Sequence, residues 1–489
     1  MQKQRCQAIK LKPCLSAPFP DNSNLVAHEK IIEKKWKGEM AIKTNIFREY
    51  DIRGVVPDEL NKDIVHLLGL GMGTYYNDKG AGRISLGRDC RLSSPDLSKW
   101  LIEGLMESGV DVVDVGMVPT PLLYFSLHQL QVDGGVQITG SHNPPEFNGF
   151  KICLGKASIF GEEIQKIRKI IESDDFRQGH GKLEKADMVD PYLRYLEKNI
   201  VPGPVKRRVV VDAGNGAGGP VGCDVYRRIG FDVIPLFCEP DGRFPNHHPD
   251  PTLPENLESL VSRVAETSAD LGIAFDGDAD RIGVVDQEGS IIWGDQLLII
   301  FSRDLLTRHP GAKIIGEVKC SQVLYDDIEK HGGQPIMWKA GHSLIKSKMK
   351  EEGALLAGEM SGHLFFSERY FGYDDAIYAG ARLLEILSKT ERSLKELLAD
   401  IPRMVNTPEI RMDCPDDKKF QVVAELVEEF KKDYEVIDVD GARVLFDEGW
   451  GLVRASNTQP VLVLRFEAKD ENGLEKIRNV FMDKVKSRL

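Results

Sequence analysis

One local pattern occurs three times in this chain and strongly limits the folds open to it. Each copy runs from a β-branched segment through a polar loop and a helical stretch to a glycine and a second apolar segment. The three copies occupy residues 84–116, 209–237 and 313–338. Short apolar runs are typical of buried parallel strands, and apolar residues repeating at about 3.6 positions are typical of a helix. The pattern predicts three βαβ units whose helices end at Gly109, Gly230 and Gly332.

The last part of the chain departs from this pattern after about Pro402. Residues 418–433 are amphipathic at a helical period, and residues 461–468 alternate as in a half-buried strand. We therefore expect an α/β protein with three tandem, topologically similar mixed α/β domains and a smaller C-terminal α+β domain. The expected segments are an N-terminal extension at 1–39 and domains at 40–189, 190–293, 294–402 and 403–489.

Length and composition narrow the class of protein further. At 489 residues the chain exceeds what one hydrophobic core supports, and no segment has the ~20 consecutive apolar residues that a membrane span needs. A net charge of −12 argues against nucleic acid or an anionic membrane as the main partner. Eight scattered cysteines without a C-x-x-C pair predict free thiols in a reducing cytoplasm. We expect a cytoplasmic enzyme that is a monomer or a small homo-oligomer.

The N-terminal 39 residues lack the continuous apolar region of a signal peptide. They predict a flexible extension without an assigned role. A second possibility is that translation starts at Met40.

The strongest chemical signal is the segment LGIAFDGDADRIG, residues 271–283. An apolar strand runs into Asp276, Asp278 and Asp280, and alternate residues of an extended chain point to the same side. Three converging carboxylates repel one another unless a cation binds between them. Oxygen ligands of this kind favour Mg²⁺, completed by a phosphate oxygen, so phosphoryl chemistry is the leading hypothesis. Arg281 is placed to hold a non-bridging phosphate oxygen.

Two other interpretations of this loop are weaker. An EF-hand needs glycine at the sixth position and glutamate at the twelfth, where this chain has Arg281 and Gln287. An aspartyl-phosphatase loop also begins with D-x-D after a strand, with Asp276 as the nucleophile, but Asp280 stands where that loop has threonine or valine. A solvated acidic turn is the non-functional alternative.

Two further loops carry polar groups that suit a sugar phosphate. Arg454, Ser456, Asn457 and Thr458 precede a strand and offer a guanidinium, hydroxyls and an amide to a phosphate, although Ser-Asn-Thr before proline is also a good turn. In residues 358–363, Glu359 and Ser361 share one side if the loop is extended and suit vicinal sugar hydroxyls; a surface turn is the alternative.

The segment TGSHNPPEFNGFKI, residues 139–152, leaves the role of its serine open. Ser141 does not lie in the G-x-S-x-G elbow of an α/β-hydrolase. The Pro-Pro pair that follows His142 and Asn143 predicts an exposed turn. Taken alone, the motif is more typical of a capped turn than of a site.

From about Thr44 to the C-terminus the chain resembles the α-D-phosphohexomutase superfamily, in its bacterial phosphomannomutase/phosphoglucomutase branch. Four independent loops match in order, and Ala279 is a small departure from a frequent glycine. The resemblance implies domains arranged around a central cleft. The motifs that carry it are FREYDIRG, TGSHNPP, NHHPDP, DGDADR, MWKAGHS, GEMSGH and RASNTQP.

The resemblance also implies roles for the loop residues. Ser141 becomes a phosphoserine that passes its phosphoryl group to a sugar phosphate through a hexose 1,6-bisphosphate, and it shares Mg²⁺ with the three aspartates. The implied catalytic group is completed by His142, Lys151, Arg281 and His363. The residues implied to bind substrate are Tyr50, Arg53, Lys319, His342, Glu359, Ser361, His363, Arg454, Ser456, Asn457 and Thr458.

The implied activity is the reversible interconversion of hexose 1-phosphates and hexose 6-phosphates. Met360 and the Ser-Asn-Thr run at 456–458 favour glucose and mannose phosphates over glucosamine phosphate within the resemblance. Phosphoglucosamine mutase, a Mg²⁺-dependent sugar-phosphate phosphatase and a non-enzymatic sugar-phosphate-binding protein remain the alternatives.

Overall fold

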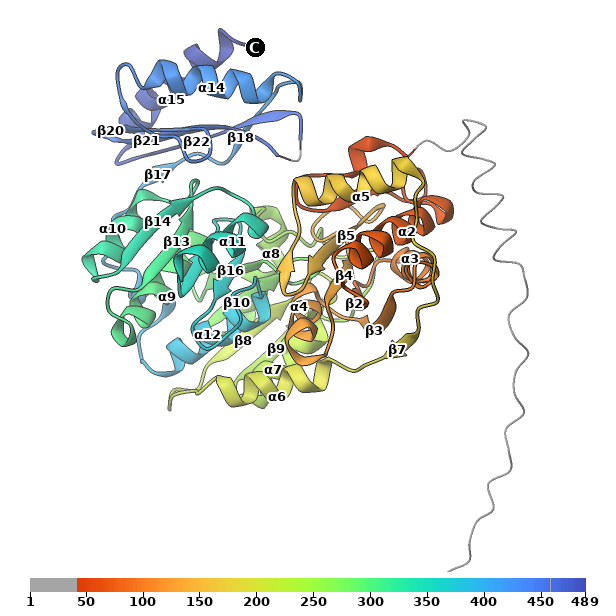
Figure 1. Cartoon of the computed structure of the whole chain (residues 1–489). Coiled ribbons are helices and arrows are strands. Elements are labelled where there is room, and N and C mark those ends of the chain that lie inside the picture. The colour runs from red at the N-terminus through yellow and green to blue at the C-terminus, as the bar shows by residue number, and fades with distance from the viewer. Residues whose placement is uncertain (1–41, 458) are drawn as a thin grey trace, which may run out of the picture. The chain divides into compact units, whose positions relative to one another are not determined.

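The computed structural model describes residues 42–457 and 459–489. By its internal contacts the chain divides into Met1–Lys43 and Thr44–Leu489, and the second unit holds four β-sheets with their helices (Figure 1). The predictions made for the N-terminal extension, Met40 and Thr458 lie outside the described residues. Within those residues no helix is long and apolar enough to cross a membrane.

The first sheet has the strand order β1-β5-β4-β2-β3-β7, with β6 paired to β5. Strands β3, β2 and β4 are parallel, whereas β5 returns antiparallel to β4. Its strands are β1 (Ile52–Val55), β2 (Arg83–Arg88), β3 (Asp111–Met117), β4 (Gly134–Ile138), β5 (Phe147–Leu154), β6 (Ala157–Ser158) and β7 (Leu183–Lys185). Its helices are η1 (Thr44–Ile46), α2 (Lys62–Asp78), α3 (Ser94–Glu107), α4 (Thr120–Gln129) and α5 (Glu162–Ser173).

The second sheet has the order β12-β11-β10-β8-β9, with β9, β8 and β10 parallel and β11 antiparallel to β10. The pair β10 and β11 leaves a six-residue connection, 276–281, that carries the three aspartates. Its strands are β8 (Arg208–Asp212), β9 (Asp232–Leu236), β10 (Leu271–Phe275), β11 (Ile282–Asp286) and β12 (Ile291–Ile292). Its helices are α6 (Val189–Asn199), α7 (Gly219–Arg228), η2 (Pro254–Leu257) and α8 (Glu258–Thr267).

The third sheet repeats this scheme with the order β14-β13-β15-β16, in which β16 is the antiparallel member. Its strands are β13 (Lys313–Glu317), β14 (Gln334–Trp338), β15 (Leu356–Gly358) and β16 (Leu364–Phe366). Its helices are α9 (Gly294–Arg308), α10 (Gln322–Lys330), α11 (His342–Glu352), α12 (Ala376–Ser388) and α13 (Leu394–Leu397).

The three predicted βαβ units form as expected, with α3, α7 and α10 as their helices. Gly109, Gly230 and Gly332 each lie two residues beyond the end of their helix, with φ of 89°, 99° and 78°. Glycine adopts this left-handed conformation without the steric cost that a Cβ atom adds.

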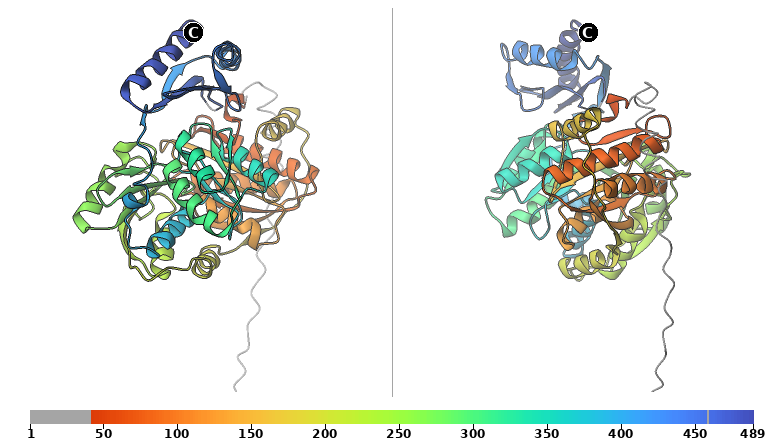
Figure 2. Two further views of the ribbon diagram at one scale, coloured as in Figure 1. Left: turned by 90° about the vertical axis from the view of Figure 1, so that its left-hand side faces the viewer. Right: turned by 45° about the vertical axis from the view of Figure 1, so that its right-hand side comes forward.

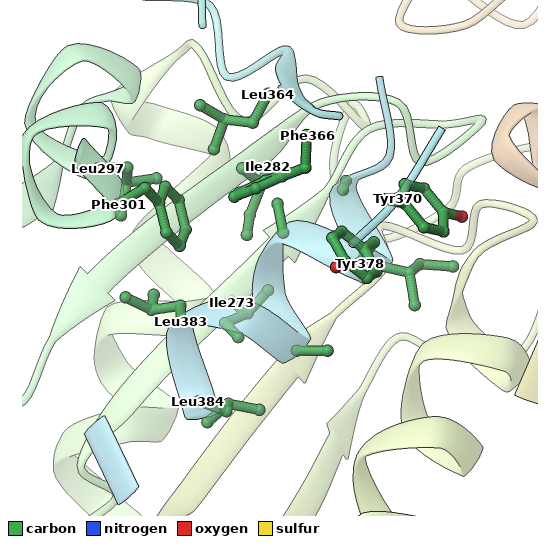
Figure 3. Close-up of a cluster of buried hydrophobic side chains, with 14 of the residues drawn as sticks. Ile273, Ile282, Leu297, Phe301, Leu364, Phe366, Tyr370, Tyr378, Leu383 and Leu384 are labelled. Atoms are coloured by element: carbon green, nitrogen blue, oxygen red, sulfur yellow. The ribbon is translucent and has the colours of Figure 1, made fainter. Parts of the chain in front are cut away.

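A shared apolar core joins the second and third sheets. Ile273 on β10 and Ile282 on β11 pack with residues of α9, β16 and α12 (Figure 3). The loops at the ends of β10 and β15 are therefore fixed relative to each other by buried side chains. The labelled members are Ile273, Ile282, Leu297, Phe301, Leu364, Phe366, Tyr370, Tyr378, Leu383 and Leu384.

The fourth sheet is antiparallel, with the order β17-β22-β21-β20-β19 and β18 paired to β22. Helices α14 and α15 cover one of its faces (Figure 2). Its strands are β17 (Val405–Asn406), β18 (Ile410–Asp413), β19 (Glu435–Ile437), β20 (Ala442–Phe446), β21 (Gly449–Ala455) and β22 (Val461–Ala468). Its helices are α14 (Lys419–Phe430) and α15 (Glu471–Lys486).

Strand β22 differs from the half-buried strand expected at 461–468, because seven of its eight residues are buried. The polar face of the strand packs against the segment that follows β13. Glu467 accepts a hydrogen bond from the Ser321 hydroxyl at 2.8 Å, and Arg465 donates to the carbonyl of Lys319. The alternating polarity of β22 therefore reflects a second face that packs against protein, and not a face that is exposed to solvent.

Candidate active site

Ser141 follows β4 and lies in a tight, buried turn. Its φ is 49°, and it is 3% exposed. Its hydroxyl donates to Asp276 Oδ2 at 2.8 Å and lies 3.1 Å from Nδ1 of His142. The exposed turn expected here holds for Pro144 and Pro145. It is wrong for Ser141, because this serine is buried against Asp276.

The Ser141 turn is held by Arg91, which we did not predict. This buried guanidinium donates to four backbone carbonyls of the turn, among them Ser141 O at 2.8 Å. Asp89 pairs with Arg91 and accepts from the backbone N–H of Gly140 at 3.1 Å. A polar run directly after a parallel strand was the sequence signal that could have indicated these two residues.

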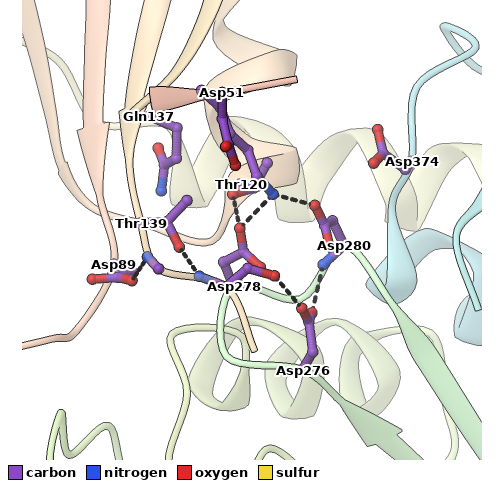
Figure 4. Close-up of polar contacts among 12 residues, drawn as sticks. Asp51, Asp89, Thr120, Gln137, Thr139, Asp276, Asp278, Asp280 and Asp374 are labelled. Carbon is purple, nitrogen blue, oxygen red and sulfur yellow. Dashed lines mark hydrogen bonds and ion pairs between the residues drawn. The ribbon is translucent and has the colours of Figure 1, made fainter. Parts of the chain in front are cut away.

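Asp276, Asp278 and Asp280 converge as expected, but on a turn and not on an extended segment (Figure 4). One carboxylate oxygen from each lies within 4.8 Å of the others. The turn requires a φ of 56° at Ala279, in the left-handed region that favours glycine. A strained residue of this kind costs on the order of 1 kcal/mol and persists only where its surroundings fix it.

The three carboxylates of the aspartate turn are not neutralised to the same extent by their surroundings. Burial, and then the charges of Asp278 and Asp280, raise the pKa of Asp276 well above its usual value. Lys151 forms ion pairs with Asp278, at 2.8 Å, and with Asp280. Burial opposes the charge on Asp278, but Lys151 holds the pKa of Asp278 below its usual value, with help from the Thr120 hydroxyl at 2.5 Å.

The acidic turn fits a divalent cation. Asp278 Oδ1 and Asp280 Oδ1 are buried and have no hydrogen-bond partner within the described part of the chain. One lysine does not neutralise three buried carboxylates, and oxygen ligands that converge without enough positive charge are the usual setting for Mg²⁺. The residues present are therefore suited to hold a metal ion.

Arg281 and two histidines lie next to the carboxylates. Nε of Arg281 donates to Nε2 of His363 at 3.0 Å. Burial and the neighbouring charges of Arg281 and Arg53 hold the pKa of His142 well below its usual value. His142 is therefore neutral at neutral pH and offers a ring nitrogen to the Ser141 hydroxyl.

The GEMSGH segment is a tight hairpin connection between β15 and β16. The N–H of Glu359 bonds the carbonyl of His363 at 2.9 Å, so the extended loop expected for Glu359 and Ser361 is wrong. Glu359 instead accepts from the backbone N–H of Gly341 at 2.6 Å, and Ser361 is half-buried in the turn. The backbone N–H of Ile282, the first residue after the segment that carries the three aspartates, donates to the carbonyl of Gly362 in this turn at 3.1 Å.

A second cluster joins three sheets at Tyr50. Its hydroxyl donates to the carbonyl of Ala340 at 3.1 Å and accepts from Nδ2 of Asn457 at 2.5 Å. Asp440 Oδ2 accepts from Nε of Arg454 at 2.8 Å and from the N–H of Ala340 at 3.2 Å. Ala340, in a loop of the third sheet, is thus bound through its carbonyl by Tyr50 and through its N–H by Asp440.

The remaining predicted residues border these two clusters. Arg53 donates to Asn143 Oδ1 at 2.8 Å beside the serine turn. The ring centroids of His342 and His363 lie 5.5 Å apart in a stacked arrangement. Lys319 donates to Glu409 at 2.8 Å.

The Ser456 hydroxyl accepts from the backbone N–H of Gln459 at 3.2 Å. This bond closes the turn that carries Asn457. Ser456 is buried beside Arg454.

Ser141 and the three aspartates, on loops of the first and second sheets, form with Lys151 of β5 a cluster of the kind that suits phosphoryl chemistry. Models of the phosphoglucomutase/phosphomannomutase family match the whole described architecture. They cover its alpha/beta/alpha domain I at 44–178, domain II at 190–289, domain III at 293–405 and C-terminal domain at 409–484.

Individual relatives agree with these matches. The chain is 49% identical to a phosphomannomutase/phosphoglucomutase of Pseudomonas aeruginosa, over 91% of this chain and 96% of that protein. It is 47% identical to a phosphoglucomutase of Neisseria gonorrhoeae, over 91% and 98% of the two chains. A crystal structure of a phosphoglucomutase/phosphomannomutase family protein from Burkholderia thailandensis has a TM-score of 0.86 at 42% identity, over 92% and 98% of the chains.

The chain belongs to the phosphoglucomutase/phosphomannomutase family. The predicted resemblance, the fold class and the assignment to the mutases, a class of isomerase, are confirmed.

Proposed function

We propose that this chain is a phosphomannomutase/phosphoglucomutase that interconverts the 1-phosphates and 6-phosphates of glucose and mannose through a phosphorylated Ser141. The observation that carries the proposal is the 2.8 Å hydrogen bond from the Ser141 hydroxyl to Asp276. It joins a hydroxyl that can accept a phosphoryl group to the acidic turn suited to hold a cation. The names of the close relatives support the same activity.

In the proposed reaction the phosphoryl group moves from Ser141 Oγ to a free hydroxyl of the sugar phosphate. The Oγ–P bond breaks as the new O–P bond forms, and the sugar hydroxyl loses its proton. His363 is the proposed proton acceptor, and Lys151 and Arg281 balance negative charge around the group in transfer. The resulting hexose 1,6-bisphosphate returns its other phosphoryl group to the serine, with the proton passing back to the sugar oxygen.

The metal expected in this site is Mg²⁺, held by Asp276, Asp278, Asp280 and a phosphoserine oxygen. When bound, it would withdraw charge from the transferring phosphoryl group and neutralise the carboxylates. Burial within the aspartate turn is what makes such a cation favourable, because the unpartnered Oδ1 atoms of Asp278 and Asp280 gain a partner.

The Tyr50 cluster is the proposed site for the phosphate that is not reacting. Arg454, Ser456, Asn457 and Thr458 supply its donors, and Glu359, Ser361 and His342 hold the sugar beside it. Arg53 and Lys319 border the same space and supply positive charge. Since the intermediate must present each end to the serine in turn, these groups are proposed to bind either phosphate.

Two other functions are the alternatives to this proposal. A phosphoglucosamine mutase would use the same machinery on an amino sugar. A Mg²⁺-dependent phosphatase would use Asp276 as the nucleophile and release phosphate, but the Ser141 hydrogen bond occupies that carboxylate. The proposal favours the mutase because the serine lies where the phosphatase substrate would have to be.

We also propose the domain boundaries 40–189, 190–293, 294–402 and 403–489, an intracellular site of action and small sugar phosphates as the partners. The separate sheets at these positions support the boundaries.

Side-by-side assays test the proposal. Glucose 1-phosphate, mannose 1-phosphate and glucosamine 1-phosphate are each supplied with Mg²⁺ and a trace of hexose 1,6-bisphosphate. We expect conversion of the first two to 6-phosphates, and a loss of about a thousandfold or more in Ser141→Ala, as for other group-carrying nucleophiles. Conversion of glucosamine 1-phosphate alone, phosphate release at the turnover rate, or a Ser141→Ala variant near the wild-type rate would each contradict it.

A further inference from the structure

Asp374 is a buried acidic residue next to the active site that the sequence did not bring out. It lies between β16 and α12, and its backbone forms a bridge with Phe365 on β16. The side chain has no exposed surface. A carboxylate enclosed in this way needs charged or polar partners to offset its lost hydration.

The partners of Asp374 are one lysine and the predicted histidines. Oδ1 accepts from Nζ of Lys346 at 3.0 Å. Oδ2 lies 3.1 Å from Nδ1 of His363 and 3.6 Å from Nδ1 of His342. Oδ2 of Asp374 and Nδ1 of His363 are both buried, and neither has an aligned hydrogen-bond partner among the described residues, so the 3.1 Å approach is an ion-pair contact.

The opposite nitrogen of His363 faces the reaction. Nε2 accepts from Nε of Arg281 at 3.0 Å, and an arginine can only donate. The lone pair of a neutral ring is therefore on Nε2 and the proton is on Nδ1, whose nearest carboxylate oxygen is Oδ2 of Asp374. Asp280 Oδ1 is the other carboxylate oxygen near Nδ1, at 3.7 Å, and Asp280 belongs to the acidic turn proposed to hold the metal.

The charge on Asp374 is maintained by its surroundings. Burial alone would raise the pKa of Asp374, but Lys346 and then His363 hold it well below its usual value. A carboxylate that stays ionised is a strong acceptor for the Nδ1 proton.

We propose that Asp374 is a positioning residue that holds the proton of His363 on Nδ1 and fixes the ring, so that the Nε2 lone pair, which accepts from Arg281 in this structure, can take the proton of the sugar hydroxyl when substrate replaces that bond. This inference rests on the proposed function, in which His363 exchanges that proton. When the O–P bond forms, the hydroxyl proton moves to Nε2, and Asp374 stabilises the resulting imidazolium. The proton returns from Nε2 to the sugar oxygen when the serine is rephosphorylated. This is the geometry by which a carboxylate orients a general base in other enzymes.

A purely structural role is the competing explanation. Asp374 would then serve as the counter-ion of Lys346, whose ammonium lies over the Tyr124 ring at 4.2 Å. The two roles make different predictions for kcat, for stability and for the state of the His363 ring.

The first test compares Asp374→Asn with Asp375→Asn in the full-length enzyme. Asp375 is equally buried, but it accepts from the hydroxyls of Tyr192 and Tyr370 and caps α12 through Tyr378 N. Because asparagine is also a good N-cap, Asp375→Asn should keep kcat within about twofold. We expect Asp374→Asn to lower kcat by about 10- to 100-fold, a part of the usual contribution of a general base, with KM changed less than about threefold.

The second test combines Asp374→Asn with His363→Gln. If Asp374 acts through His363, the double variant has the kcat of His363→Gln alone. A double variant whose two losses multiply would overturn the proposal, as would an Asp374→Asn variant with wild-type kcat.

The third test reads the His363 ring directly and needs no stable Asp374 variant. Nitrogen-15 NMR of the wild-type histidine side chains, with His363→Gln to identify the signal, should show the proton on Nδ1. A proton on Nε2 would overturn the proposal. A wild-type enzyme that shows no mutase activity would instead contradict the proposed function. The failure of this inference and the failure of the proposed function are therefore distinguishable.

Discussion

Lys151 is a single ammonium enclosed by two carboxylates, with 6% of its side chain exposed. Burial opposes its charge, but Asp278 and Asp280 raise the pKa of Lys151 above its usual value. The lysine therefore remains charged and supplies part of the positive charge that the acidic turn needs. The divalent cation proposed for this site would supply the rest, so the two cations would be partly interchangeable for stability but not for phosphoryl transfer.

Because Lys151 and the proposed cation share the same carboxylates, Lys151→Met should change both the stability of the protein and its response to Mg²⁺. Removing one partner of a buried ion pair costs about 3 kcal/mol or more, so the melting temperature of the metal-free protein should fall. Mg²⁺ should raise the melting temperature of the variant more than that of the wild type, since the ion restores missing positive charge. Differential scanning fluorimetry with and without Mg²⁺ measures both effects.

The matched control is Lys166→Met, because Lys166 pairs with Glu163 on the exposed face of α5. A surface pair of this kind contributes about 0–1 kcal/mol. An equal gain from Mg²⁺ in wild type and Lys151→Met would show that the lysine and the metal do not share the same carboxylates.

At the scale of elements, the candidate active site depends on close backbone contact between the aspartate turn at 276–281 and the turn that carries Ser141. A Cβ atom added to Gly277 would lie 2.4 Å from the carbonyl oxygen of Ser141. The absence of a side chain at this position allows Asp276 to reach the Ser141 hydroxyl.

Gly277→Ala should therefore separate the two loops and lower kcat by at least about tenfold, because small displacements of reacting groups reduce rates strongly. Gly82→Ala is the control, since nothing lies within 4 Å of its added Cβ atom and the backbone there is ordinary. Steady-state kinetics of both variants decides the matter. Equal kcat in the two variants would mean that the loop contact is not required.

The elements that local sequence could predict were those with a short-range signal. The βαβ units follow from periodicity and from Gly109, Gly230 and Gly332, and the convergence of the three aspartates follows from their spacing, although they lie on a turn and not on the extended segment expected. Ala279 could not be assigned a left-handed conformation, because nothing in DGDAD requires φ of 56° until the turn is packed. The half-buried pattern expected for β22 was wrong because its polar face packs on another sheet.

The residues that sequence could not bring out act through contacts between separate segments. Asp374 and His363 lie on opposite sides of β16 in the sequence, and Asp440 contacts Arg454 of the fourth sheet and Ala340 of the third sheet. Their sequence neighbourhoods resemble ordinary capped turns. The candidate site predicted from motifs is therefore the part proposed to touch substrate, and the groups that orient it appear only in three dimensions.

At the scale of the whole molecule, Tyr50 links loops that lie 290 and 407 residues away in sequence. Burial raises the pKa of the Tyr50 hydroxyl well above its usual value, so it stays protonated and can donate to Ala340 while it accepts from Asn457. These bonds join the proposed phosphate-binding loop to a loop of the third sheet through Tyr50.

Tyr50→Phe removes this hydroxyl and keeps the ring. We expect KM for glucose 1-phosphate to rise by about five- to thirtyfold, since each net hydrogen bond contributes about 0.5–1 kcal/mol and two are lost, with a smaller change in kcat. Tyr75→Phe is the control, because the Tyr75 hydroxyl bonds Glu163 away from the site. Initial-rate kinetics measures the split, and an unchanged KM would contradict a role for Tyr50 in phosphate binding.

The central claim is that Ser141 carries the phosphoryl group between substrate and product. A single turnover of phosphorylated enzyme with an equal amount of glucose 1-phosphate, labelled with ³²P in its phosphate, tests this most directly. The account predicts that the label ends on Ser141, located by peptide mapping, while the first glucose 6-phosphate formed is unlabelled. Label that stays in glucose 6-phosphate, or that appears as free phosphate, would contradict it.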